Sequence, residues 1–169
     1  MLKQVQHDDD AGGAGALLIR DATEADLPAI VAMLADDVNG AAREDPSLPL
    51  DPGYLDAFIA IESTPNLHLF VAERGGTLVG TFQLYFLPGL SNKGAWRAQI
   101  EAVRVASSLR SQGIGAHMIE WAIARARAHG AHVIQLTTMN NRADAHRFYE
   151  RLGFRPSHVG MKLYLKDHA

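Results

Sequence analysis

The chain has 169 residues, which is enough for one domain around a single hydrophobic core. With 47% hydrophobic residues, 21% charged residues and a formal net charge of −3, it has the composition of a soluble globular protein and no basic excess, so we expect neither nucleic acid nor a membrane as a partner. It contains no cysteine, which excludes disulfides, a cysteine nucleophile and a thiolate metal site. No apolar run approaches the ~20 residues of a membrane span, and the polar N-terminus does not resemble a signal peptide, so we expect a cytoplasmic protein.

The first half of the chain begins with a segment that buries little. Met1–Ala16 is polar, then acidic, then rich in glycine and alanine, which predicts a tail or linker and leaves 17–169 as a single domain. The elements expected next are a strand at Leu17–Arg20, a helix that begins after Thr23, a helix at Tyr54–Ile61, and a hairpin of Leu67–Glu73 and Thr77–Leu87. Thr23 is a typical N-cap residue, because acidic residues follow it in the first turn and apolar residues then recur at helical spacing.

The second half of the chain alternates strands and helices. It continues with a loop at Pro88–Gly94, a strand at Trp96–Ala106, a helix at Gly113–His129, a strand at His132–Thr138, a helix at Ala143–Leu152 and a final strand at Met161–Leu165. Gly130 is suited to end the long helix, because glycine readily adopts the left-handed conformation found there. Since a hairpin comes first and a β-α-β unit follows, this order predicts an α/β (α+β mixed-sheet) fold with helices on both faces.

A glycine-containing loop, Arg110-Ser111-Gln112-Gly113-Ile114-Gly115-Ala116, lies between an expected strand and an expected helix. Glycine lets the backbone approach a ligand closely, and the first turn of a helix presents free N–H groups and a positive dipole end. This combination suits phosphate, and Arg110 can add a charge-assisted contact. Taken alone, however, a G-x-G sequence is equally typical of a helix start that binds nothing.

Two other phosphate motifs do not fit the sequence. A dinucleotide motif would need a third glycine at the position of Met118. The glycines of Gly89–Gly94 have the spacing of a phosphate loop, but Ala95 stands where that motif needs lysine.

Two signatures in a fixed order give the loop a more specific meaning. The first, R/Q-x-x-G-x-G/A, is matched by Arg110, Gly113 and Gly115. The second, A-x-x-F/L-Y-x-x-x-G-F, follows one strand later and is matched by Ala145, Phe148, Tyr149, Gly153 and Phe154. Together they resemble the GNAT superfamily of acyl-CoA-dependent N-acyltransferases, and the resemblance extends from Arg20 to Leu165.

The resemblance implies a central, mostly antiparallel sheet in which the parallel strands four and five splay apart. These strands would be Ala98–Ala106 and His132–Thr138. The pantetheine arm of acetyl-CoA would lie in the gap and pair with the first of them like an added strand. Val103, Arg104 and Val105 would then contact the arm, while Arg110, Ser111, Gln112, Gly113, Ile114, Gly115 and Ala116 would wrap the pyrophosphate.

Two residues are the catalytic candidates. Tyr149 stands where the family often has a general acid, and a phenol suits this role because its pKa is close to that of the departing thiol. A tyrosine packed beside Phe148 is the structural alternative. Glu101 is the candidate general base, and strand alternation would place it on the same side as Val103 and Val105. A hydrogen-bonded strand glutamate is the alternative there, and some members of the family have no dedicated base.

Weaker indications concern the remaining polar residues. The family's cofactor-contacting asparagine falls here at Arg142, so Asn141 matches it only with a displacement of one, and a loop cap is the alternative. The eight histidines form no metal-binding pattern, and we expect no metal. The acidic segment Asp36–Asp45 suits either a cationic amine or a solvated surface.

The sequence thus predicts an N-acetyltransferase that uses acetyl-CoA and transfers the acetyl group to a primary amine by direct attack in a ternary complex. The acceptor would be a small-molecule or peptide amine of unidentified structure. An acyl-CoA-binding regulatory module without turnover is the alternative. The family resemblance is also compatible with a homodimer.

Overall fold

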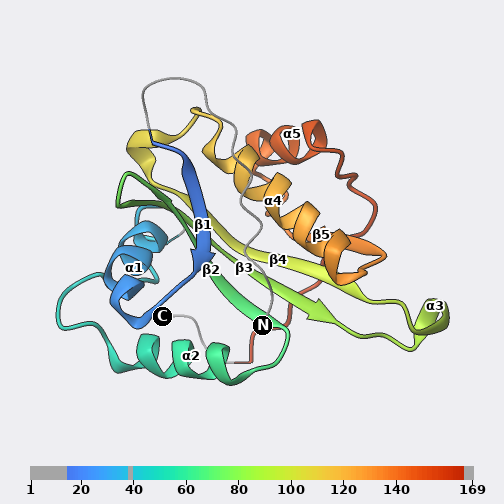
Figure 1. Cartoon of the computed structure of the whole chain (residues 1–169), viewed down its shortest axis with the longest axis horizontal. Helices are drawn as coiled ribbons and strands as arrows, with labels where there is room; N and C mark the ends of the chain where they lie inside the picture. The colour runs from blue at the N-terminus through green and yellow to red at the C-terminus, as the bar shows by residue number, and fades with distance from the viewer. Residues whose placement is uncertain (1–14, 38–39, 166–169) are drawn as a thin grey trace.

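The computed structural model describes residues 15–37 and 40–165 (Figure 1). Its strands are β1 (Leu17–Asp21), β2 (Leu67–Arg74), β3 (Thr77–Leu87), β4 (Arg97–Val105) and β5 (Val133–Leu136). Its helices are α1 (Leu27–Ala35), α2 (Pro52–Ser63), the single turn α3 (Ser91–Gly94), α4 (Ile114–His129) and α5 (Ala143–Arg151), with 3-10 turns η1 (Glu24–Asp26) and η2 (Ser107–Leu109). Residues 1–14 of the expected tail lie outside the described residues.

One predicted element is wrong. Met161–Leu165 is not a strand: its backbone pairs with no strand of the described chain, and Met161, Leu163 and Leu165 are 85–94% exposed. The alternation of apolar residues that predicted the strand is real, but alternation identifies a face and not the edge on which a strand must pair. Among the described helices, none combines the length and apolar character needed to cross a bilayer.

The five strands form one mixed sheet in the order β1-β2-β3-β4-β5. The first four are antiparallel neighbours, and β5 pairs with β4 in parallel. Helices α1 and α2 lie on one face of the sheet, and α4 lies on the other with α5 beyond it (Figure 1). The predicted architecture of a mostly antiparallel sheet with helices on both faces is therefore confirmed.

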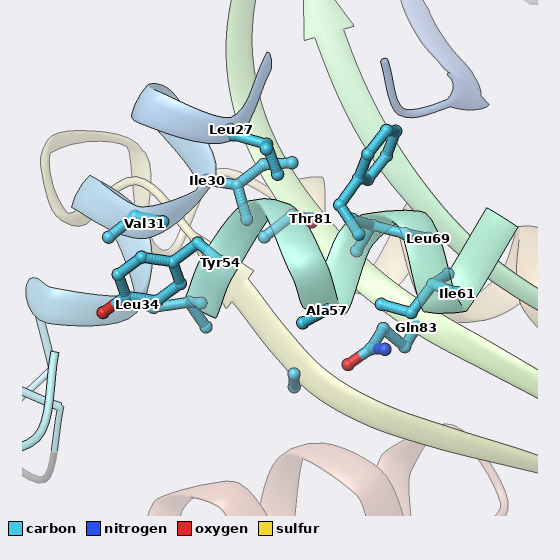
Figure 2. Close-up of a pocket in the computed structure, with 12 residues that line it drawn as sticks. Leu27, Ile30, Val31, Leu34, Tyr54, Ala57, Ile61, Leu69, Thr81 and Gln83 are labelled. Carbon is cyan, nitrogen blue, oxygen red and sulfur yellow. The ribbon is translucent and has the colours of Figure 1, made fainter. Parts of the chain in front are cut away.

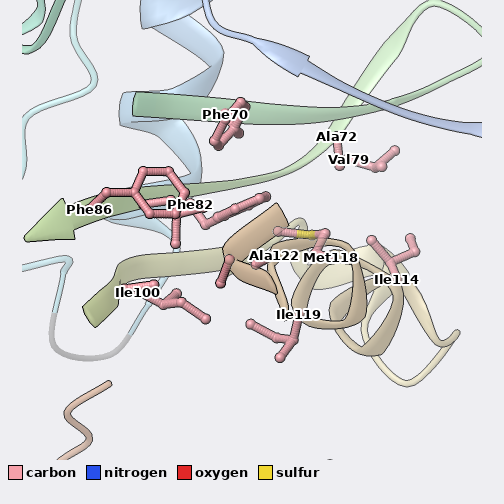
Figure 3. Packing of buried hydrophobic residues seen from close by; sticks show 13 residues of the cluster. Phe70, Ala72, Val79, Phe82, Phe86, Ile100, Ile114, Met118, Ile119 and Ala122 are labelled. Atoms are coloured by element: carbon pink, nitrogen blue, oxygen red, sulfur yellow. The ribbon is translucent and has the colours of Figure 1, made fainter. Parts of the chain in front are cut away.

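The main core lies between the sheet and α4 (Figure 3). Met118, Ala122 and Ala126 recur every four residues along α4, and each is at most 3% exposed. They face buried sheet residues such as Phe82 and Ile100. A smaller cluster under α1 and α2 covers the opposite face. Because both faces of β3 and β4 are covered, these strands form a rigid floor for a site at their ends.

The start of α1 is tied to the edge of the sheet. The predicted cap at Thr23 is present, since its N–H and hydroxyl donate to the Asp26 carboxylate at 2.8 and 3.0 Å. Arg20 of β1 donates to both oxygens of that carboxylate at 2.7 and 3.0 Å, which lowers the pKa of Asp26 to about 2. This link fixes the direction of α1, whose other end reaches β4.

Candidate active site

The predicted phosphate loop leads directly into α4. Gly113 is the N-cap of this helix and has φ = 81°, a left-handed conformation that glycine adopts without strain. A Cβ built there would meet no atom within 4 Å, so the position is open to a ligand. Gly115 has a different role, because its Cβ would lie 3.4 Å from Phe148 and 3.6 Å from Val105. The second glycine of the motif therefore allows α4, α5 and β4 to pack closely.

The other loop residues also divide into residues exposed to a ligand and residues that pack against the protein. Ser111 and Gln112 are exposed, and Ser111 has φ = 64°, so the backbone turns sharply before the helix. Ile114 is 1% exposed and anchors the helix start in the core, which leaves its N–H as the group that can meet a phosphate. Ala116 is half-buried on the first turn. The loop thus has the backbone N–H groups and helix dipole that an anion site needs.

Arg110 points toward protein carbonyls. Its guanidinium donates to the carbonyl oxygen of Asp36 at 3.0 Å and, through Nε at 3.4 Å, to that of Val105. In this position Arg110 joins the loop to the end of α1. A contact between Arg110 and a phosphate stays a prediction.

The second half of β4 has no partner strand on the β5 side, because β5 ends before β4 does. The two strands pair only from Arg97–Ile100 to Val133–Leu136, while β4 continues to Val105. The Ala106 N–H bonds to the Val79 carbonyl of the β3 side, so by alternation Val103 and Val105 direct their backbone groups to the other, unpaired edge. This edge can accept an extended ligand as an added strand.

A β-bulge in β4 corrects the predicted orientation of Glu101. The register passes from Gln83–Glu101 to Thr81–Arg104, so β4 contains one residue more than β3 at this point. Ala102 is the irregular residue, with φ = 52°. As a result Glu101 lies on the α1–α2 face opposite Gln83, whereas Val103 and Val105 pack on the α4 face. Strand alternation alone had placed all three on one side, and no glycine marks the bulge.

Glu101 sits in a polar chain that crosses two strands. Gln135 of β5 donates to the Gln99 side chain at 2.7 Å, and Gln99 donates to the Glu101 carboxylate at 2.8 Å. The pKa of the neighbouring Tyr85 is raised by burial and by the negative charge of Glu101. The geometry therefore orients the carboxylate, and it is compatible with both a base and a structural glutamate.

Tyr149 lies on α5, where it meets the core of the α4 face. Its ring forms edge contacts with Phe148 and Phe154, at centroid distances of 5.0 and 5.8 Å. Burial raises the pKa of its hydroxyl, and the charges of Arg142 and Arg104 lower it in part. Because the net shift is upward, Tyr149 carries its proton at neutral pH, as a general acid must.

A pocket of about 150 Å³ lies on the opposite face, between α1, α2 and the sheet (Figure 2). Apolar side chains of both helices line it, and Thr81, Gln83 and Ala102 form its floor. Ala102 is the bulge residue, so the pocket adjoins Glu101 on one side and the open edge of β4 at Val103 on the other. Sequence reasoning did not locate this pocket, because its walls come from segments distant in the chain.

The remaining predicted residues are peripheral or lie elsewhere. Asn141 is exposed in the turn before α5. The side chain of Arg104 extends on the α1–α2 face, and the alternation that turns Val103 and Val105 to the open edge turns the Arg104 backbone toward β3, so a cofactor contact of Arg104 stays a prediction. Within residues 15–37 and 40–165, no cluster of three or more histidine, aspartate or glutamate side chains is arranged to hold a metal.

Comparison with known proteins identifies the family. The acetyltransferase (GNAT) family model matches residues 35–154. The chain is 37% identical over 105 residues to an aminoalkylphosphonate N-acetyltransferase of Salmonella typhimurium, covering 62% of this chain and 68% of that protein. It is 29% identical over 144 residues to an L-methionine sulfoximine/L-methionine sulfone acetyltransferase of Pseudomonas aeruginosa, covering 80% and 78%.

Solved structures share the fold of this chain. A Bacillus halodurans protein described as a transcriptional regulator is 49% identical, with a TM-score of 0.86 over 89% of this chain and 100% of that chain. A putative acetyltransferase of Agrobacterium tumefaciens is 28% identical, with a TM-score of 0.77 over 87% and 99%. Since the family model covers most of the chain and the fold and loop agree with it, the chain belongs to the acetyltransferase (GNAT) family and is an acyl-CoA-dependent N-acetyltransferase that uses acetyl-CoA.

Proposed function

We propose that the chain acetylates a small primary amine by direct attack in a ternary complex with acetyl-CoA. The amine nitrogen bonds to the thioester carbonyl carbon, and the carbon–sulfur bond breaks. Glu101 accepts the amine proton, directly or through water, and Tyr149 gives its proton to the departing sulfur. The chain has no cysteine, so an acyl-cysteine intermediate is not available and direct attack is favoured.

The observation that carries this proposal is the bulge at Ala102. It allows one short stretch of β4 to serve three parts of the site, since Ala102 lines the pocket, Glu101 lies on the same face of the sheet, and Val103 presents its backbone to the open edge. An acyl arm on that edge and an amine in the pocket would meet at the bulge. Holding two reactants in such an arrangement supplies a large part of the rate in two-substrate enzymes.

The cofactor is assigned to the loop and the edge for separate reasons. The loop residues from Arg110 to Ala116 would bind the pyrophosphate through backbone N–H groups at the start of α4. Val103 and Val105 would bind the pantetheine arm through the backbone, while the cofactor contacts of Arg104 and Asn141 rest on the family resemblance alone. When bound, acetyl-CoA supplies the activated acetyl group.

The acceptor we propose is a small molecule. Two relatives are named for small amines, an aminoalkylphosphonate and a methionine derivative. The pocket, at about 150 Å³, has room for a compact body of this kind, and its apolar walls suit an aliphatic chain. A peptide amine would need an open groove at the same place.

The experiment is an assay of free thiol released from acetyl-CoA in the presence of a panel of small amines, amino acids and short peptides. We expect release that depends on a small amine, with the acetylated amine confirmed by mass spectrometry. Thermal stabilisation by acetyl-CoA without turnover on any amine would overturn the catalytic proposal. That result would favour a binding module. This alternative is worth testing because the Bacillus halodurans relative is described as a transcriptional regulator.

We also propose that two copies of the chain associate. The support is a pair of complementary features, namely the exposed apolar side chains of Val159, Met161, Leu163 and Leu165 in the tail and the outer edge of β5, which pairs with no described strand and where Val133 is 51% exposed. An extended apolar segment can pair with an edge strand as an added β-strand. If two copies exchange their tails, the tail of each copy pairs with β5 of the other.

A further inference from the structure

The guanidinium of Arg104 is not fully paired within the protein. Its side chain is 17% exposed, and one terminal nitrogen donates to the Val103 carbonyl at 2.8 Å. The other terminal nitrogen lies 3.5 Å from the Asp37 carboxylate, which is longer than the roughly 2.7–2.9 Å of a charge-assisted bond. Its Nε is buried and has no partner among the described residues. A buried donor in this state costs free energy unless a ligand completes it.

The position of Arg104 places this charge at the centre of the site. Arg104 pairs in register with Thr81, which forms part of the pocket floor. Its terminal nitrogen reaches the Val103 carbonyl, which belongs to the open edge of β4. Arg104 does not itself line the pocket, but it lies beside the pocket floor and the open edge, and its positive charge acts on the Tyr149 hydroxyl.

The surroundings of Arg104 are positively charged. Burial lowers the pKa of Arg104, Asp37 raises it, and the charges of Arg142 and Arg43 lower it again. Among the described residues whose charges affect the pKa of Arg104, Asp37 is the one carboxylate. The guanidinium groups are three, namely Arg104 itself, Arg43 and Arg142.

Apart from Asp37, the acidic segment Asp36–Asp45 does not neutralise this charge, because its other carboxylates are engaged elsewhere. Asp36 accepts from the Ser107 N–H at 3.3 Å, Glu44 accepts from the Tyr54 hydroxyl at 2.9 Å, and Asp45 accepts from Ser47. The attraction of a cationic acceptor to this segment, which the sequence left open, therefore has little support in the structure.

A purely structural role for Arg104 would be to join β4 to the end of α1 through Asp37. The contact is too long to account for the buried charge, and it leaves Nε without a partner. A planar guanidinium that has donors to spare and lies close to the floor of a pocket is typical of carboxylate or phosphonate recognition.

We propose that Arg104 binds an anionic group of the acceptor, so that the substrate is a small amine that carries a carboxylate or phosphonate. This inference rests on the proposed function. The aliphatic part of the molecule would occupy the pocket, its anionic group would meet Arg104, and its amine would point toward the bulge. The class includes amino acids and aminoalkyl phosphonic acids and excludes polyamines and aminoglycosides.

The experiment compares acceptors in pairs in which one member has lost its negative charge. Each pair contains an anionic amine and its neutral derivative, such as β-alanine with β-alaninamide and 2-aminoethylphosphonate with its diethyl ester. We expect the wild-type chain to prefer the anionic member in kcat/KM by roughly 10- to 100-fold, the value of a hydrogen bond to a charged group. The carboxylate and phosphonate pairs distinguish the two anions.

Variants then assign the preference to Arg104. Arg104→Met should lower kcat/KM roughly 10- to 100-fold on the anionic member, mainly through KM, and should change the neutral member little. Arg104→Lys keeps the positive charge but lacks the paired donors of the guanidinium group, so it should retain part of the preference. Arg97→Met is the matched control, because Arg97 is exposed at the other end of β4. It should leave both members unchanged.

Each failure has a separate meaning. Equal activity of the wild-type chain on charged and neutral members would overturn the role of Arg104 while the acetyltransferase reaction stands. An equal loss on both members in Arg104→Met would show a structural link to α1. Absence of thiol release with every amine would instead refute the proposed function. If Arg104→Met does not fold, methylphosphonate is tested on the wild-type chain: competition with the amine and not with acetyl-CoA is expected, and no inhibition would contradict the proposal.

Discussion

At the scale of single residues, Tyr149 combines a half-buried phenol with two nearby arginine charges. Burial raises the pKa of Tyr149, so its proton is present throughout the neutral range and is lost only above the ordinary tyrosine pKa of about 10. A general acid acts in its protonated form, so turnover should fall as the pH rises through this elevated pKa. Tyr149→Phe should lower kcat by roughly 10- to 1,000-fold and remove this alkaline limb.

Thiol release over a range of pH measures both effects, with thermal stabilisation by acetyl-CoA as the control. We expect Tyr149→Phe to bind acetyl-CoA nearly as well as the wild-type chain, because the ring remains and packs on Phe148 and Phe154. Unchanged turnover would remove Tyr149 from the mechanism and leave it as a packed aromatic residue.

At the scale of elements, the junction between the loop and α4 depends on Gly113. Valine at this position would be strained at φ = 81° and would fill the open space beside the helix start. Gly113→Val should therefore abolish detectable acetyl-CoA binding, measured by calorimetry. Gly76→Val is the matched control, since Gly76 has φ = 78° and an equally open Cβ position in the β2–β3 turn.

This control separates backbone strain from blockage of the cofactor site. If both variants lose stability to a similar extent and only Gly113→Val loses acetyl-CoA binding, the loop is the phosphate site. Normal binding by Gly113→Val would place the pyrophosphate elsewhere.

At the scale of the whole molecule, the exposed tail and the open edge of β5 predict a dimer in which strands are exchanged. Light scattering after gel filtration should give twice the chain mass. Deletion of residues 158–169 should give a monomer, and so should Val133→Lys, because a charge on an edge strand opposes pairing. Leu90→Ser is the control, since Leu90 is 99% exposed in the β3–β4 hairpin and lies outside both features. A wild-type chain that is monomeric at micromolar concentration would contradict the proposal.

The sequence by itself determined the features that lie within one element or one junction. The loop from Arg110 to Ala116, the long helix after it and the signature around Tyr149 follow from local spacing, and local spacing fixes helix caps and faces. These features were sufficient for the family, the cofactor and the order of strands and helices. Nearly all predicted elements are present for the same reason, because apolar periodicity reports which face of an element is buried.

Tertiary structure decided everything that depends on a partner strand or a distant segment. The bulge at Ala102 arises where β4 pairs with β3, and it places Glu101 on the α1–α2 face although alternation had placed it with Val103. The unpaired nitrogen of Arg104 is visible only when Asp37 and Val103 are in place around it. The same limit explains the tail at 161–165, since an alternating sequence can specify a strand but cannot specify the edge that receives it.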